Sequence, residues 1–476
     1  MVQRRDFLVG GAIAGAALLA RRAQAQDGHG EHGEHGEHGG HGGHGGHGGH
    51  AGHGAPAGER APSGTQAETS ERSWVPAVRT DRTPLFPGGP LPVHVPNGTK
   101  LPWRRVGDWK VGHLVAEPID HELAPGLRAR VFGYNGRTPG PLIEAVEGDR
   151  VRIFVTNRLP EPTTVHWHGM ILPAGMDGVS GLNQPPIPVG ATFKYELTLR
   201  DAGTFMYHAH HDEMVQIGLG LSGMFVVHPR RPRGPRVAND YALLTHEWRV
   251  DPGMRRADPN EMTDFNVFTF NAKAWPATEP MLVGVGERTR IRLGNLSPMT
   301  HHPIHFHGHH FTITETDGGA VPESAQRPEA TALVPVGTVR VIEFISRVPG
   351  DWALHCHMTH HVMMQMGHGI PNMLGVDARA LDARVQRVLP EYHTMGATGM
   401  HGMAQMDMAM PVNSIPMRGG PGPFGYVDMG GMMTVVKVRE DADGADPAGW
   451  YENPVGTVAS EATAEELRAA GISVDG

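Results

Sequence analysis

Cysteine is almost absent from this sequence. Its 476 residues include one cysteine, Cys356, so no disulfide can form within the chain, and the fold must be stable without one. Charged residues make up only 19%, while 65 glycines and 40 prolines favour turns and short strands over helical bundles. The formal net charge of −9 argues against nucleic acid as a partner and is compatible with cationic metal substrates.

Long hydrophobic runs are missing as well. The apolar stretch at residues 9–20 is too short to cross a bilayer comfortably. It follows an Arg4-Arg5 pair and precedes an Ala-x-Ala site at 23–25, which is typical of a twin-arginine export signal. We therefore predict a signal peptide at 1–25, a periplasmic or secreted protein, and no membrane contact after signal removal. A membrane anchor is the alternative interpretation of this stretch.

The single cysteine has metal-binding neighbours. It lies between His355 and His357, with His361 five positions and Met366 ten positions after it. Two imidazoles, one thiolate and a weak axial thioether form a blue-copper electron-transfer site. This spacing predicts such a site around Cys356.

Three histidine pairs with alternate spacing occur upstream, and His302 stands three residues before the third pair. The pairs are His166/His168, His208/His210 and His305/His307. Because alternate residues of a strand point to the same face, each pair can offer two imidazoles to one metal cluster. The same alternation sends Cys356 away from its two neighbouring histidines. Its thiolate can bind one copper while both imidazoles reach a second cluster, which makes a short path for electrons.

These four segments, in this order, resemble the four copper-binding motifs of multicopper oxidases. Residues 133–149, which read Gly-Tyr-Asn-Gly, then Pro-Gly-Pro, then Glu-Gly-Asp, also resemble the first-domain sequence of that family. The resemblance implies an all-β fold of two cupredoxin-like Greek-key β-sandwich domains. It also implies four copper ions per functional unit. The implied ligands are His302, Cys356, His361 and Met366 for type 1 copper; His166 and His305 for type 2; His168, His208 and His357 for one type 3 ion; and His210, His307 and His355 for the other.

Composition and spacing divide the chain. After the signal, we predict a disordered His-rich segment and linker at 26–100, domain 1 at 101–232, domain 2 with type 1 copper at 233–376, and a Met-rich extension at 377–476. The nine histidines repeated through the His-rich segment either collect metal weakly or are incidental to a solvated spacer. The methionines of the extension either handle Cu(I) or pack over the oxidase.

The spacing also bears on assembly. Only 91 residues separate His210 from His302, which leaves no room for a domain between the two sandwiches. Each domain would then supply four histidines to a cluster at a domain interface. In the two-domain relatives that interface lies between subunits of a homotrimer, so the resemblance implies a trimer here.

The resemblance implies one-electron oxidation of a donor coupled to four-electron reduction of dioxygen to water. Cys356 would carry the electrons, and Asp177 would relay protons or orient a ligand; Asp212 and Glu213 are alternative proton carriers, and Asp177 can instead be a turn residue before Gly178. The donor is either a phenol, as in laccases, or a metal ion such as Mn(II) or Cu(I). A non-catalytic periplasmic copper-sequestration protein is a further alternative. Copper nitrite reductase also has two cupredoxin domains, but it lacks the eight-histidine cluster.

Overall fold

The structure is a computed structural model that describes residues 75–232, 234–260, 264–364, 379–388, 412–415, 419–446 and 449–473. These residues belong to one compact unit, residues 65–476. The predicted signal peptide, the histidine repeat, Met366 and most methionines of the C-terminal extension lie outside the described residues.

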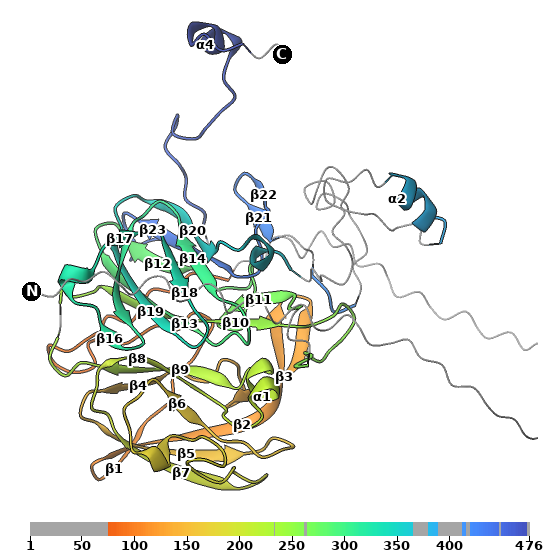
Figure 1. Ribbon diagram of the computed structural model, residues 1–476. Coiled ribbons are helices and arrows are strands. Elements are labelled where there is room, and N and C mark those ends of the chain that lie inside the picture. Colours follow the sequence, from red (N-terminus) through yellow and green to blue (C-terminus); the bar gives the residue numbers. More distant parts are fainter. Residues whose placement is uncertain are drawn as a thin grey trace, which may run out of the picture. The chain divides into compact units, whose positions relative to one another are not determined.

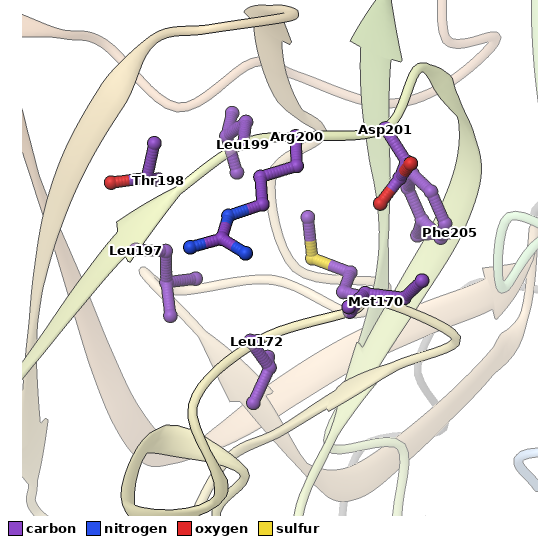
Figure 2. Close-up of a pocket in the computed structure, with 9 residues that line it drawn as sticks. Met170, Leu172, Leu197, Thr198, Leu199, Arg200, Asp201 and Phe205 are labelled. Atoms are coloured by element: carbon purple, nitrogen blue, oxygen red, sulfur yellow. The ribbon is translucent and has the colours of Figure 1, made fainter.

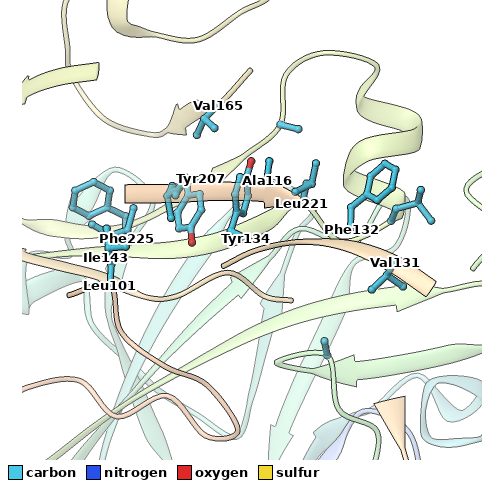
Figure 3. Packing of buried hydrophobic residues seen from close by; sticks show 14 of the residues in the cluster. Leu101, Ala116, Val131, Phe132, Tyr134, Ile143, Val165, Tyr207, Leu221 and Phe225 are labelled. Carbon is cyan, nitrogen blue, oxygen red and sulfur yellow. The ribbon is translucent and has the colours of Figure 1, made fainter. Parts of the chain in front are cut away.

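The first half of the described chain forms a β-sandwich (Figure 1). One sheet contains β1 (Arg104–Val106), β2 (Trp109–Ala124), β3 (Leu127–Tyr134), β5 (Arg150–Asn157) and β7 (Thr192–Thr198). The other contains β4 (Ile143–Val146), β6 (His166–His168), β8 (Gly203–His208) and β9 (Ser222–His228). Buried side chains from both sheets pack into one core, in which Tyr134, Ile143, Tyr207 and Phe225 lie together (Figure 3).

The second half forms another sandwich. Its larger sheet contains β10 (Asn239–Trp248), β11 (Val267–Phe270), β13 (Arg288–Asn295), β15 (Phe311–Thr316), β16 (Gly319–Ala320), β17 (Pro328–Glu329) and β19 (Val339–Ile345). The smaller contains β12 (Met281–Gly284), β14 (His302–Phe306), β18 (Thr331–Val334), β20 (Gly350–Cys356) and β23 (Met433–Arg439). Both sheets contribute to a second buried cluster, which includes Cys356.

Helices are few and short in the described part of the chain. They are α1 (Glu213–Gly218), α2 (Arg379–Val385) and α4 (Ala464–Ala469), with 3₁₀ turns η2 (Ala174–Met176), η3 (Glu323–Ala325) and η4 (Thr359–Val362). The remaining strands, β21 (Gly420–Gly422) and β22 (Gly425–Val427), form a hairpin. The predicted all-β class is confirmed. No helix among the described residues has both the length and the apolar character that crossing a bilayer requires.

The two sandwiches pack directly against each other. A third buried cluster combines Met206, Met224 and Val226 of the first sandwich with apolar residues of β10 and β19. Arg292 of β13, which is fully buried, donates from Nη1 to Thr204 Oγ1 of β8 at 2.6 Å. Apolar burial and a buried charge therefore both contribute to this contact.

Strand β23 comes from beyond residue 376, in the segment described above as an extension. It pairs in parallel with β12 and antiparallel with β20. It is therefore an interior strand of the sheet that carries the His-Cys-His segment (Figure 1).

Candidate metal centre

Strand alternation places the first two histidine pairs on one face of the first sandwich. In β6, Trp167 points into the core against Tyr195, with ring centroids 5.3 Å apart, while His166 and His168 are partly exposed. His166 lies directly opposite His208 in the pairing of β6 with β8. The four imidazoles form one group, with ring centroids 5.3 to 6.0 Å apart. We call these residues the first quartet: His166, His168, His208 and His210.

The second sandwich repeats this arrangement. His305 lies directly opposite His355 in the pairing of β14 with β20. His307 Nε2 and His355 Nε2 are 3.1 Å apart, and the ring centroids of the group are 4.7 to 5.7 Å apart. We call these residues the second quartet: His305, His307, His355 and His357. Within the described part of the chain, no ring contact or hydrogen bond joins a histidine of one quartet to a histidine of the other.

Backbone carbonyls orient several of these rings. The Nδ1 atoms of His166, His208, His305 and His355 each lie 2.8 Å from a carbonyl oxygen. An Nδ1–H that donates to a carbonyl leaves the Nε2 lone pair free to bind a metal. In His168 the two ring nitrogens exchange these positions. Its Nε2 lies 2.8 Å from the Gly337 carbonyl oxygen, and its Nδ1 lies 3.3 Å from His208 Nε2.

A separate set of ligands lies in the second core. His302 is on the buried face of β14, with Ile304 and Phe306, whereas His305 is partly exposed. The Cys356 Sγ is 3.7 Å from His302 Nδ1 and 3.3 Å from His361 Nδ1, and the two Nδ1 atoms are 3.1 Å apart. Ser297 Oγ contacts the outer nitrogen of His302 at 2.6 Å, and Phe268 stacks on His361 with centroids 4.1 Å apart.

Burial controls protonation at both places. Burial lowers the pKa of His302 to about 3 and that of His208 to about 3. These imidazoles are therefore neutral at pH 7 and can act as ligands. Burial also raises the pKa of the Cys356 thiol to about 12, so the free thiol keeps its proton until a bound cation stabilises the thiolate.

The donor atoms fit a transition metal. Zn²⁺, which is in the same row of the periodic table as copper, binds imidazole nitrogen at about 2.0 Å and thiolate sulfur at about 2.3 Å. Ligand atoms around an ion of this size therefore lie about 3 to 4 Å from one another. The three distances around Cys356 fall within that range. His166, His168 and His208 likewise offer ligand atoms within 4.8 Å of one another. The His₂Cys set is typical of copper.

The structure thus brings together most of the predicted ligands. His302, Cys356 and His361 converge on one point, and the other eight histidines form the two quartets. Met366 lies outside the described residues. The backbone of Met432 lies beside Cys356, whose amide donates to the Met432 carbonyl at 3.0 Å.

The predicted carboxylates lie beside the first quartet. Asp177 Oδ1 is 3.4 Å from His166 Nδ1, and the Asp177 carbonyl is the 2.8 Å acceptor of the same nitrogen. Gly178 permits this turn, because its φ is +90° and an added Cβ would lie 1.8 Å from the Val165 carbonyl oxygen. Glu213 Oε1 lies 3.0 Å from His210 Nε2. Asp212 is the left-handed residue that precedes α1.

A small pocket lies next to the loop that follows His168. Figure 2 shows its mostly apolar lining, which includes Met170, Leu172 and Phe205, together with Arg200 and Asp201. None of the predicted metal ligands lines it. The pocket is therefore distinct from the candidate metal sites.

Comparisons with known proteins agree with this geometry. Two family models, both described as multicopper oxidase, match residues 116–232 and 251–373, which together make up about half of the chain. Copper resistance protein A of Pseudomonas syringae pv. tomato is 27% identical over 40% of this chain and 39% of its own length. Laccase-1 of Cryptococcus neoformans var. grubii is 29% identical over 47% of this chain and 39% of its own length.

A solved structure is similar as well. The blue copper oxidase from Nitrosomonas europaea matches with a TM-score of 0.50 and 25% identity, over 68% of this chain and 85% of that chain. The chain spans about two fifths of the length of copper resistance protein A and of laccase-1, the two curated relatives named above. This chain and the blue copper oxidase share the cupredoxin-like architecture. The family models, the relatives and the two-sandwich fold lead to one conclusion: the chain belongs to the multicopper oxidase family.

Proposed function

We propose that this protein couples one-electron oxidation of a reducing substrate to four-electron reduction of dioxygen to water, with four copper ions per functional unit. One observation carries the proposal. Cys356, at the end of β20, is part of a buried His₂Cys set, whereas its immediate neighbours His355 and His357 belong to the second quartet. The two proposed metal sites would thus be joined by consecutive residues of the chain.

The residues take distinct roles in this proposal. His302, Cys356 and His361 hold the electron-accepting copper with an axial thioether, and the eight quartet histidines hold the other three ions. When bound, copper supplies one-electron redox chemistry at the first site and dioxygen reduction at the second. The chain supplies the link: from the Cys356 side chain, the covalent backbone leads in one residue to either His355 or His357. Burial around Cys356 keeps water from its sulfur.

Asp177 is proposed to deliver the protons that water formation consumes. Its carboxyl contacts His166, and its side chain is 31% exposed, so it can exchange protons with solvent and lies beside the quartet. Its backbone carbonyl separately orients the His166 ring. Glu213 contacts His210 and is the second candidate for this role.

We also propose that the oxygen-reducing site closes between subunits of a homotrimer. Among the described residues, no ring contact or hydrogen bond joins the two quartets, and a head-to-tail ring of subunits would bring unlike quartets together. Exposed apolar side chains beside the first quartet support an interface there: Ile171 is 71% exposed, Leu182 79% and Met214 48%. The segment of Leu182 is tied to the quartet, because Ser180 N donates to the His210 carbonyl.

The reducing substrate is proposed to be a phenol or a metal ion. The relative named laccase supports a phenol, and the relative named copper resistance protein supports a metal ion. A periplasmic location after twin-arginine export completes the proposal, on the basis of the N-terminal sequence. Turnover with a phenol, Cu(I) and Mn(II), compared side by side, identifies the donor.

The decisive experiment combines metal analysis, electron paramagnetic resonance and oxygen consumption on the purified protein. Four coppers per chain are expected, one of them blue and one normal, with a coupled pair that gives no signal. Cys356→Ser should lose both the intense blue absorption and turnover. If the wild type binds copper but consumes no oxygen with any of the three donors, the sequestration function replaces the oxidase.

The assembly has its own test. Leu182→Asp should give monomers that keep the blue absorption and lose oxygen reduction, while Val455→Asp, at a fully exposed position, should remain assembled and active. Sedimentation or light scattering measures the assembly state. A Leu182→Asp monomer with full activity would contradict an intersubunit site.

A further inference from the structure

A short loop, residues 296–301, connects β13 to β14 and leads directly into the ligand His302. Within this loop, Ser297 Oγ lies 2.6 Å from His302 Nε2. The other ring nitrogen, Nδ1, faces Cys356 Sγ at 3.7 Å. Because Nδ1 must keep its lone pair to bind a metal, Nε2 carries the ring N–H and donates to the serine hydroxyl oxygen. The hydroxyl thereby selects the tautomer and the ring orientation that copper binding requires.

One buried carboxyl group on β10 holds this loop. Glu247 Oε1 accepts from the Met299 amide at 2.7 Å and from the Thr300 amide at 3.0 Å, and the Thr300 hydroxyl donates to Oε2. Glu247 is fully buried, and within the described part of the chain the hydrogen-bond partners of its carboxyl all belong to this loop. A buried polar group that loses its partner is costly. The carboxyl and the loop therefore keep each other in place.

Further hydrogen bonds fix the backbone around the serine. The Ser297 amide donates to Asn295 Oδ1 at 2.9 Å, and Asn295 Nδ2 donates to the Thr300 carbonyl at 3.0 Å. His246 Nδ1 lies 3.0 Å from the Leu296 carbonyl oxygen. Asn295, Ser297 and His246 are all buried. The hydroxyl is thus attached to a backbone whose position several buried contacts determine.

The neighbouring strand supports the other imidazole of the His₂Cys set. Phe268 lies directly opposite Glu247 in the pairing of β10 with β11, and its ring stacks on His361 with centroids 4.1 Å apart. In contrast to His302, His361 has a buried Nε2 without a hydrogen-bond partner in the described part of the chain. Opposed residues of two paired strands therefore support both ligand rings, one through hydrogen bonds and the other through stacking.

We propose that Glu247 and Ser297 position His302 as a ligand of the copper. Glu247 holds the 296–301 loop, and the Ser297 hydroxyl then fixes the imidazole with Nδ1 toward the metal. A hydrogen bond donated by the outer ring nitrogen also raises the basicity of the ligand nitrogen, which favours Cu(II) over Cu(I) and lowers the reduction potential. The inference rests on the proposed function, and it adds the residues that set the geometry and potential of the electron-accepting site.

Copper affinity and the reduction potential of the copper-loaded protein test the proposal without relying on turnover. Ser297→Ala should weaken Cu(II) binding at the blue site about 10–100-fold, as the loss of such a partner typically does, and should raise its reduction potential. Chelator competition followed at the blue band measures the affinity, and a redox titration measures the potential. Ser346→Ala is the matched control and should change neither quantity, because Ser346 is fully buried after β19 and its hydroxyl has no partner among the described residues.

Two substitutions of Glu247 separate positioning from charge. Glu247→Gln keeps an acceptor for the two amides and offers an N–H to the Thr300 hydroxyl oxygen, so its affinity and potential should stay close to those of the wild type. Glu247→Leu removes the acceptors, so it should reproduce the shifts of Ser297→Ala. Combining Glu247→Leu with Ser297→Ala should add little to either single variant, because both act through the same hydrogen bond to His302.

The other outcomes are decisive as well. In a wild type that shows the blue band, unchanged affinity and potential of Ser297→Ala, or equal shifts in Ser346→Ala, overturn the proposal. A Glu247→Gln variant that shifts as far as Glu247→Leu assigns the effect to charge and overturns positioning. If Glu247→Leu does not fold, Thr300→Val removes only the hydroxyl that donates to Glu247 and should give a smaller shift in the same direction; no shift there overturns the role of Glu247. A wild type without a blue band refutes the proposed function instead.

Discussion

A buried ion pair in the second sandwich, at its contact with the first, allows a quantitative prediction. Arg292 and Asp240 form a two-pronged pair, with Nε–Oδ1 and Nη2–Oδ2 distances of 2.8 Å, and their side chains are 2% and 1% exposed. Arg292 also donates to Thr204 of the first sandwich. Arg292→Met removes these three contacts and a 3.5 Å contact to Glu315 Oε2. It leaves Asp240 with Arg290, whose Nη1 is 3.4 Å away.

Removing one member of a buried pair costs about 3–5 kcal/mol, because the other charge remains buried. Arg290 compensates in part, so we expect Arg292→Met to lower the free energy of unfolding by about 3 kcal/mol. Replacing both residues with apolar ones, as in Arg292→Met with Asp240→Leu, should restore most of this loss. Arg340→Met is the control, since its pair with Asp317 has side chains 22% and 46% exposed and should contribute at most about 1 kcal/mol.

Urea unfolding of the metal-free variants measures these differences, provided that fluorescence and circular dichroism give coincident transitions. Absence of metal removes the contribution of copper binding to stability. If Arg292→Met and Arg340→Met destabilise equally, or if the double variant is no more stable than Arg292→Met, the buried charge of Asp240 is not the cause of the destabilisation.

Three further predictions follow from local geometry. Gly431→Ala should lower the melting temperature and disturb the blue spectrum, because the Cβ would meet the His361 carbonyl; Gly286→Ala, with φ +83° and nothing within 4 Å, should pay only the backbone cost of about 1–2 kcal/mol. Asp177→Asn keeps the carbonyl that orients His166, so it should retain copper but change the pH–rate profile; an unchanged profile excludes the relay. Although burial opposes ionisation of Asp240, the charges of Arg292 and Arg290 hold its pKa below the usual value. The stabilisation that ionised Asp240 provides is therefore complete above the unfolded pKa of about 3.9. It is lost as the pH falls through the lower folded pKa. Lowering the pH below that value should therefore reduce the free energy of unfolding of the wild type more than that of the double variant.

Much of the site was predictable because it is local in sequence. Alternate positions on a strand face the same way, so His166 and His168 had to share a face, and Cys356 had to point away from His355 and His357. The structure agrees: Trp167 is buried between its two histidines, and Cys356 is in the core. Residue type and spacing were sufficient for these inferences.

Contacts between distant segments were a different matter. Spacing could not show that β23 pairs with β20, the strand that ends at Cys356. The interior position of β23 in the sheet was not predictable either, because an apolar strand matches many partners and only the completed sheet selects one.

By itself, the sequence determined the all-β class, the candidate histidine and cysteine ligands, and which of them share a strand face, because these depend on residues a few positions apart. Only the tertiary structure decided that the imidazoles of one chain form two groups, that Asp177 lies against His166, and that β23 pairs with the strand that ends at Cys356. Those relations depend on which distant strands pair and on how two cores pack, and no local pattern specifies either.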